Sequence, residues 1–227
     1  MAIADHRSEV WIRRAGLSLA LMAMVAFSGP AYRAEAQAAE PAPKTSALPQ
    51  PGSYAIDSPH TFLYFSAQHK MVGMVRGRFD KMSGTLVSAK DPAACRVDVT
   101  IETASVSTQN AIRDEDLRSD AFFHAEKFPT MEYHGQGIRR SGPGWVMDGS
   151  LTIRGISKVV PLTFEFKGVA PPQAGQPARV AFHARAAVKR ADFGIVRDLP
   201  SDIGPSSSRP DVWIEIDAEA LASAAAK

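Results

Sequence analysis

Cysteine is nearly absent from this chain of 227 residues, which contains Cys95 and no other. A single cysteine cannot form an internal disulfide, so packing alone must hold the fold together. Cys95 also lies far from the N-terminal region, which excludes the class of envelope protein whose lipid anchor is attached to a cysteine at the export-signal cleavage site. We predict an inert thiol at Cys95, because nothing nearby would form a redox pair with it.

Long apolar runs are scarce as well. The stretch 15–27 is about a dozen residues long, whereas a membrane-spanning helix needs about 20. It follows the basic pair Arg13 and Arg14 and precedes Ala34-Glu35-Ala36, whose small residues have the spacing that a signal peptidase recognises. We therefore predict a signal peptide at residues 1–36. The expected mature chain is soluble, without stable membrane insertion, and is periplasmic or secreted in a bacterial cell envelope.

Net charge is also low. The whole chain has 26 basic and 24 acidic side chains. Removal of residues 1–36 would leave 26 − 4 = 22 basic and 24 − 3 = 21 acidic groups. A charge near zero argues against nucleic acid and anionic membranes as the main partners.

Catalytic and metal-binding motifs are missing too. The sequence has no G-x-S-x-G elbow and no H-E-x-x-H pair. His60, His69, His124 and His134 are spaced too irregularly to suggest a shared ion, so we predict no metal. We predict a protein that is not an enzyme. The alternative is a lipid-modifying enzyme with His69 as a general base, which would need a nucleophile or carboxylate that the sequence does not identify.

The chain does contain segments in which apolar and polar residues alternate with a period of two. Residues 37–52 are rich in Ala and Pro and predict a flexible tether, whereas residues 53–222 carry period-two patterns typical of strands. Apolar residues alternate around Leu63, Val99, Leu151, Phe164 and Ile214. Turn-forming clusters are predicted between these strands at residues 135–144, 168–177 and 204–210. Residues 149–155 predict a strand that ends in a tight hairpin. The pattern predicts an all-β barrel or sandwich.

Residues 108–125 break this rhythm. Asn110 could cap a first helical turn, and Asp120 a second turn before Phe122 and Phe123. We predict two short helices or turns that cross one end of the barrel.

Several short motifs lie along the chain in a fixed order and spacing. They are Ile56-Asp57-Ser58-Pro59-His60, Phe65 with His69, Gly77-Arg78-Phe79, Met82-Ser83-Gly84, Arg113-Asp114 with Leu117, Asp120-Ala121-Phe122-Phe123, Lys127-Phe128-Pro129, Gly149-Ser150-Leu151-Thr152-Ile153-Arg154-Gly155 and Ala191-Asp192-Phe193-Gly194-Ile195. Together, over residues 54–221, they resemble the YceI-like family of exported, lipocalin-like, polyisoprenoid-binding proteins. The resemblance implies an antiparallel eight-stranded lipocalin-like barrel, closed so that it has no exposed edge, with an elongated apolar cavity and a short helical crossing at one end. It also implies a long-chain apolar amphiphile as ligand, such as a polyisoprenoid, an isoprenoid quinone or a fatty amide, and no other cofactor.

The candidate cavity liners are the large apolar residues that share the inward parity of their strands, together with aromatic residues of the crossing. A register error of one residue would exchange lining and outer positions. The predicted liners are Leu63, Phe65, Ala67, Phe79, Val99, Ile101, Phe122, Phe123, Met131, Tyr133, Leu151, Ile153, Phe164 and Phe182.

Two polar residues are candidates for binding the ligand's polar end group. His69 shares the parity of Leu63 and Phe65, and Arg113 lies at the start of the crossing, where an ion pair or cap is the competing structural role. The outward aromatic residues Phe62 and Tyr64 would suit a homodimer. A barrel whose interior is filled by its own side chains remains the alternative to a binding protein, and ligand identity stays open.

Overall fold

The alternating segments form antiparallel strands in the computed structural model, which describes residues 48–69, 73–197 and 210–223. The predicted signal peptide and most of the predicted tether lie outside these residues, as does the predicted turn at 204–209. The strands in chain order are β1 (Gly52–Ile56), β2 (Phe62–His69), β3 (Gly73–Phe79), β4 (Met82–Ser88), β5 (Arg96–Glu102), β6 (Val106–Ser107), β7 (Thr130–Gln136), β8 (Arg139–Ser141), β9 (Gly144–Ile153), β10 (Ile156–Ala170), β11 (Arg179–Val188) and β12 (Val212–Ala222).

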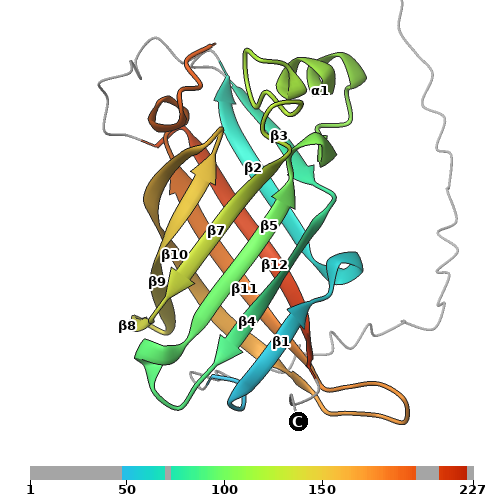
Figure 1. Cartoon of the computed structure of the whole chain (residues 1–227), viewed down its shortest axis with the longest axis vertical. Coiled ribbons are helices and arrows are strands. Elements are labelled where there is room, and N and C mark those ends of the chain that lie inside the picture. The colour runs from blue at the N-terminus through green and yellow to red at the C-terminus, as the bar shows by residue number, and fades with distance from the viewer. Residues whose placement is uncertain (1–47, 70–72, 198–209, 224–227) are drawn as a thin grey trace, which may run out of the picture. The chain divides into compact units, whose positions relative to one another are not determined.

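Several short strands continue one another along a common line. The 3-10 turn η1 (Ser58–His60) separates β1 from β2, β4 follows β3 after a bend at Asp80, and η3 (Thr103–Ser105) separates β5 from β6. β12 pairs with β2 through its first half and with β1 at its end, which closes the sheet. The result is a closed barrel with eight antiparallel strand positions, because β1 with β2, β3 with β4, and β5 with β6 each count as one. The short strand β8 is added beside β9 (Figure 1). The predicted barrel is thereby confirmed.

The predicted hairpin at residues 149–155 connects β9 to β10. Arg154 and Gly155 form its tip with φ angles of 54° and 73°. Two consecutive positive φ angles are the geometry of a type I′ turn, which matches the right-handed twist of the paired strands. Ile153 and Ile156 pair directly beside this turn.

Two of the predicted turn clusters contain strand residues, which corrects the prediction. Gly135 lies within β7 and Gly144 begins β9. Gly168 lies within β10, where the register against β11 shifts between Phe166 and Gly168, as at a bulge. At Gly135 the Met147 side chain, and at Gly144 the Phe164 backbone, take the space of the missing Cβ, so glycine continues the strand at these two positions.

The predicted crossing is one helix followed by turns. Helix α1 (Ala111–Arg118) begins at Asn110, whose side chain accepts a hydrogen bond from the Arg113 backbone N–H. Turns at residues 120–123 follow it. Two further 3-10 turns are η2 (Pro92–Ala94) and η4 (Arg190–Phe193). We call the end of the barrel near α1 the helix end, and the other the opposite end (Figure 1).

The apolar core is the inward face of the barrel wall. Its fully buried side chains include Phe193, Met147, Val106 and Val180. Among the described residues, no helix has the length and apolar character needed to cross a membrane.

Candidate functional site

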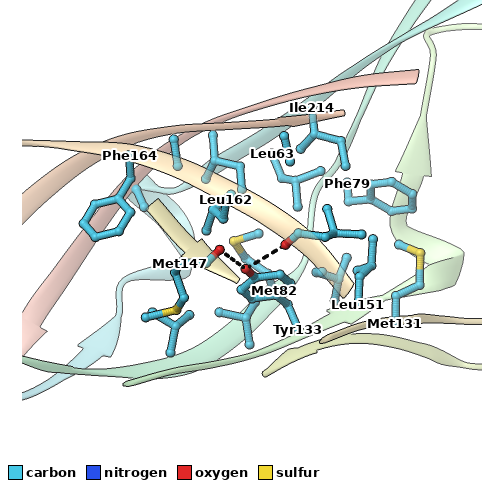
Figure 2. A pocket seen from close by; sticks show the side chains of 18 of the residues that line it. Leu63, Phe79, Met82, Met131, Tyr133, Met147, Leu151, Leu162, Phe164 and Ile214 are labelled. Carbon is cyan, nitrogen blue, oxygen red and sulfur yellow. Dashed lines mark hydrogen bonds between the residues drawn. The ribbon is translucent and has the colours of Figure 1, made fainter. Parts of the chain in front are cut away.

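An apolar cavity of about 250 Å³ runs inside the barrel. The inward residues of successive strands line it, because a strand presents alternate side chains to opposite faces. Figure 2 shows ten labelled members of the lining, from Leu63 of β2 to Ile214 of β12. The cavity extends from Phe193 at the helix end to Tyr54 at the opposite end.

All the apolar and aromatic candidates from the sequence line this cavity. The strand parity was therefore assigned correctly at each of those that lie on strands, although a role in binding stays a prediction. These lining residues are Leu63, Phe65, Ala67, Phe79, Val99, Ile101, Phe122, Phe123, Met131, Tyr133, Leu151, Ile153, Phe164 and Phe182.

The two polar candidates do not line the cavity. His69 is exposed at the last position of β2, where the strand reaches the rim of the barrel and no wall remains to enclose an inward side chain. Arg113 lies on α1 and donates to Thr108, at 2.7 Å to Oγ1 and 3.0 Å to the carbonyl oxygen. Its observed contacts hold the helix to the preceding loop, which is the structural role that the sequence left open.

Tyr133 brings a buried polar group into the wall of the cavity. Its hydroxyl lies 3.2 Å from the Met147 carbonyl oxygen and 3.1 Å from that of Val160, as the dashed lines in Figure 2 show. Burial raises the pKa of Tyr133 to about 12, so the phenol stays protonated at neutral pH. Because the hydroxyl proton is directed to the wall, the middle of the cavity presents an apolar surface.

The helix end is closed by aromatic side chains and one buried ion pair. Phe79 and Phe123 meet edge to face, with ring centroids 5.5 Å apart. Arg190 also lines the cavity, and its Nε donates to Asp211 at 2.5 Å. Asp211 is almost completely buried, so the pair fixes the start of β12 beside the end of β11.

The opposite end is covered by the segment before β1. Leu48 and Pro49, which belong to the predicted tether, line the cavity here. The Ser88 hydroxyl donates to the Pro49 carbonyl at 2.9 Å, and the Tyr54 hydroxyl donates to the Gln50 carbonyl at 2.7 Å. These bonds attach the segment to the barrel.

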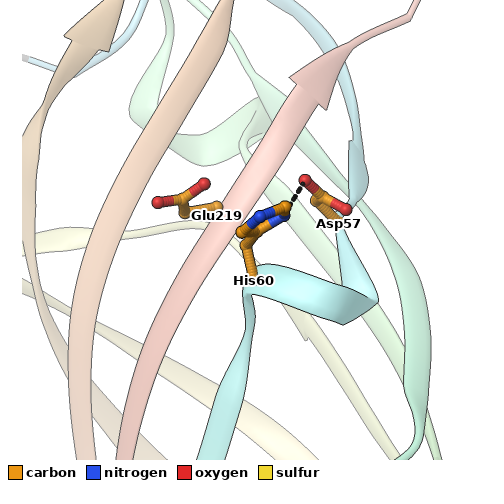
Figure 3. Close-up of side chains that lie close together, drawn as sticks. All are labelled: Asp57, His60 and Glu219. Atoms are coloured by element: carbon orange, nitrogen blue, oxygen red, sulfur yellow. Dashed lines mark hydrogen bonds and ion pairs between the residues drawn. The ribbon is translucent and has the colours of Figure 1, made fainter.

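A second cluster lies outside the cavity and brings Asp57, His60 and Glu219 together (Figure 3). The Arg179 guanidinium donates to both carboxylates, so a cation already occupies the space between them. Burial by itself would raise the pKa of Asp57, but hydrogen bonds from Arg179 and His60 outweigh it and hold that pKa below its ordinary value. We assign this cluster to holding strand ends together.

The four histidines considered for a metal site have separate surroundings in the structure. His60 contacts Asp57, His124 packs against Phe128, and His134 lies 2.9 Å from Asp98 and 3.3 Å from Glu132. The hydrogen bonds to Asp98 and then Glu132 raise the pKa of His134.

Sequence reasoning missed several lining residues. Ala184, Ala186 and Ile216 have the same inward parity as the predicted liners and could have been found from it. Arg190 and Leu48 could not, because they belong to a 3-10 turn and to a segment without periodicity.

A family model described as the YceI-like domain matches residues 54–220. A UPF0312 protein from Photorhabdus laumondii is 34% identical over 169 residues, which cover 73% of this chain and 85% of that protein. Protein YceI from Escherichia coli O157:H7 is 35% identical over 170 residues, with 72% and 85% covered.

Solved structures agree with the fold. A Campylobacter jejuni YceI protein superposes with a TM-score of 0.57 at 31% identity, covering 69% of this chain and 90% of that one. A protein from Saccharophagus degradans, described as a polyisoprenoid binding domain implicated in plant cell wall breakdown, gives a TM-score of 0.57 at 16% identity, covering 75% and 98%. At that identity the likeness concerns the fold alone.

Proposed function

The chain belongs to the YceI-like family, and from that premise we propose that it is a non-enzymatic protein that encloses one long-chain apolar amphiphile inside its barrel. The proposed ligand class is a polyisoprenoid, an isoprenoid quinone or a fatty amide. The observation that carries this proposal is the cavity, whose lining is apolar along nearly its whole length.

The energetics of burial support a ligand with a long chain. Each methylene transferred from water to an apolar environment is worth about 0.8 kcal/mol. Burial of ten methylenes therefore contributes about 8 kcal/mol before the entropic cost of binding is subtracted. Affinity of this kind needs no specific polar contact, so the shape and volume of the cavity would select the ligand.

The charged lining residues suggest the nature of the polar end group. Arg190 lies at the helix end and Arg96 at the opposite end, and no carboxylate lines the cavity within the described residues. Because Asp211 already balances the charge of Arg190, the lining suits an end group that accepts hydrogen bonds better than an amine. Arg190 and Arg96 thus replace His69 and Arg113 as the candidates for contact with the polar end group of the ligand.

The lining hydroxyl and thiol groups support a role without catalysis. The Ser88 hydroxyl donates to a backbone carbonyl, and the Cys95 thiol lies 3.8 Å from the Ala89 carbonyl and 3.9 Å from that of Asp91. Within the described chain, neither group has a histidine or carboxylate partner that would activate it as a nucleophile.

We further propose that the protein acts in the periplasm or outside the cell after removal of residues 1–36. There it would carry the lipid between sites or sequester it during stress. The basic and apolar pattern of the first residues supports export.

The test begins with protein purified from its native envelope without detergent. Organic extraction followed by mass spectrometry should release one long-chain amphiphile in a ratio of about one to one. Absence of any lipid, together with failure to take up added isoprenoid quinone or fatty amide, would reject the proposal. A barrel filled by its own side chains would then be the better account.

Two adjacent residues provide a matched pair of variants. Ala186 of β11 lines the cavity, whereas Ala187 is exposed on the outer wall. Ala186→Phe should occupy the space of about five methylenes and weaken uptake by several hundredfold or more, at about 0.8 kcal/mol each. Ala187→Phe should leave uptake unchanged. Equal uptake by both folded variants would place the ligand elsewhere.

A further inference from the structure

The two ends of the cavity are closed in different ways. Ring contacts and the buried pair of Arg190 with Asp211 close the helix end. The three residues 48–50 close the opposite end, and we call them the plug. Leu48 and Pro49 contribute to the lining of the cavity, and Pro49 is buried. The plug is thus part of the cavity wall, although it belongs to no strand or helix.

Two side-chain hydroxyls attach the plug to the barrel. Ser88 donates to the Pro49 carbonyl oxygen at 2.9 Å, and Tyr54 donates to the Gln50 carbonyl oxygen at 2.7 Å. No backbone–backbone hydrogen bond reaches the plug from any other residue that the structure describes, and the ladder between β1 and β4 begins only at Gly52. Retraction of the plug would therefore break two hydrogen bonds and its apolar contacts, but no part of the sheet.

The sequence of the plug suits a segment that moves as one unit. Pro49 and Pro51 each fix their own φ angle and restrict the preceding residue to extended conformations. Little conformational entropy is therefore gained or lost when the plug leaves or returns. Leu48 is the only large apolar residue between positions 37 and 52. Because it lies in the cavity lining, it serves as the apolar anchor of the plug.

We propose that the opposite end is the entrance to the cavity, and that the plug retracts to admit the amphiphile and returns to enclose it. This inference rests on the proposed function and adds the route by which the ligand enters and leaves. Retraction places the freed carbonyl and hydroxyl groups in water, where they find new hydrogen-bond partners. Opening the helix end at its ion pair would instead separate the Arg190 guanidinium from Asp211, which is 1% exposed, and leave a buried charge unpaired. The opposite end therefore opens at the lower cost.

Cys95 supplies a readout that needs no ligand. It is the one cysteine of the chain, and its buried side chain lines the cavity. The ladder between β4 and β5 ends with Val87 paired to Arg96, so Ser88 and Cys95 follow in the next row toward the opposite end. Because Ser88 holds the plug, retraction should expose the Cys95 thiol to a reagent that enters from this end.

Labelling of the purified protein with N-ethylmaleimide, followed by mass spectrometry, measures this exposure. The labelling rate is proportional to the fraction of molecules in which the thiol is accessible. Ser88→Ala leaves the Pro49 carbonyl without its donor and should raise the rate about fivefold, as should Tyr54→Phe for the Gln50 carbonyl. Leu48→Ser removes the apolar anchor and should raise the rate about tenfold. The urea midpoints of these variants should stay close to that of the wild type, because the plug lies outside the strand ladders.

Ser119→Ala is the matched control at the other end of the barrel. Ser119 Oγ donates to the Asp116 carbonyl oxygen at 2.6 Å and so fastens the end of α1. The substitution removes the same kind of hydrogen bond from the helix end, and Ser119 does not line the cavity. Labelling of Cys95 should therefore proceed as in the wild type.

Stopped-flow exchange of cis-parinaric acid, a long-chain fatty acid whose fluorescence rises in an apolar environment, tests the route itself. Uptake and release both pass through the open state, so Ser88→Ala and Leu48→Ser should quicken both by similar factors. The dissociation constant should then change less than either rate. Substitutions that only altered contacts with the bound lipid would change the dissociation constant instead.

Unchanged labelling of Cys95 in the plug variants would overturn the proposal. Faster exchange of cis-parinaric acid in Ser119→Ala alone would also overturn it, because that result would place the entrance at the helix end. If the wild type takes up neither cis-parinaric acid nor the proposed lipids, while the plug variants still label faster, retraction of the plug is supported and the proposed function fails.

Discussion

Substitution of Gly149 by alanine should destabilise the barrel through one identified collision. Gly149 lies in β9 on the cavity side of the wall, directly under the ring of Tyr133. A Cβ atom at this position would lie 2.3 Å from Tyr133 Cζ and 2.4 Å from its hydroxyl oxygen. The ring has little freedom to retreat, because its hydroxyl is hydrogen-bonded to the carbonyl oxygens of Met147 and Val160.

The expected magnitude follows from three contributions. Overpacking of a filled site costs about 1–3 kcal/mol. Displacement of the ring would also break a hydrogen bond worth about 1 kcal/mol. The lower conformational entropy of the unfolded alanine chain offsets this by about 0.4–1 kcal/mol. We expect Gly149→Ala to lower the free energy of unfolding by about 1–3.5 kcal/mol, which corresponds to a fall in Tm of about 2–14 °C for a chain of this size.

Urea unfolding with an unchanged m-value would measure the loss. Gly73→Ala in β3 is the matched control, because its Cβ would have no atom within 4 Å. It should change the free energy by less than about 1 kcal/mol. The penalty should disappear when Gly149→Ala is made in a Tyr133→Leu background, which removes Cζ and the hydroxyl. An equal penalty in both backgrounds, or none in wild type, would refute the collision.

Three further outcomes follow from single contacts. Asn110→Ala removes the cap of α1 and should cost about 1 kcal/mol, measured by urea unfolding. Asp211→Ala leaves the buried Arg190 without its carboxylate and should cost about 3–5 kcal/mol, seen as a lower Tm. The contacts of Asp57 with Arg179 and His60 depress the pKa of its carboxyl group, so the ionised carboxylate stabilises the fold at pH values above the ordinary pKa of about 3.9. This stabilisation is lost as the pH falls through the lower folded pKa. Asp57→Asn should therefore be less stable than wild type at pH 7, and in thermal melts the difference should shrink as the pH falls below the ordinary pKa of about 3.9 and through the lower folded one.

Strand parity could be predicted from the sequence because the barrel wall enforces it. In β2, Leu63 and Phe65 are buried and Phe62 and Tyr64 are outward, as the alternation indicated. A shift of one residue would have moved every inward side chain to solvent. The extrapolation failed at His69, because parity states which way a side chain points and not whether the wall still encloses it.

The ends of the cavity could not be predicted, because they depend on contacts between segments distant in sequence. Arg190 is positioned by Asp211, which follows it by 21 residues, and also donates to the Gln68 carbonyl. The Pro49 carbonyl is held by Ser88, 39 residues away. Arg113 could have faced the cavity or the loop from its helix, and the hydrogen bonds to Thr108 decide between them.

Inward glycines explain why an interior so rich in large side chains is hollow. The Phe65 ring lies across Gly77, its direct partner on β3, where a Cβ would be 2.5 Å from the ring. The Tyr133 ring lies over Gly149 in the same way. Each glycine lets a ring lie flat against the wall, whereas a side chain there would push the ring toward the barrel axis. Gly77 and Gly149 both belong to the family's motifs, and each leaves room for a large lining ring to pack against the wall. The sequence therefore specifies the cavity as directly as it specifies the strands.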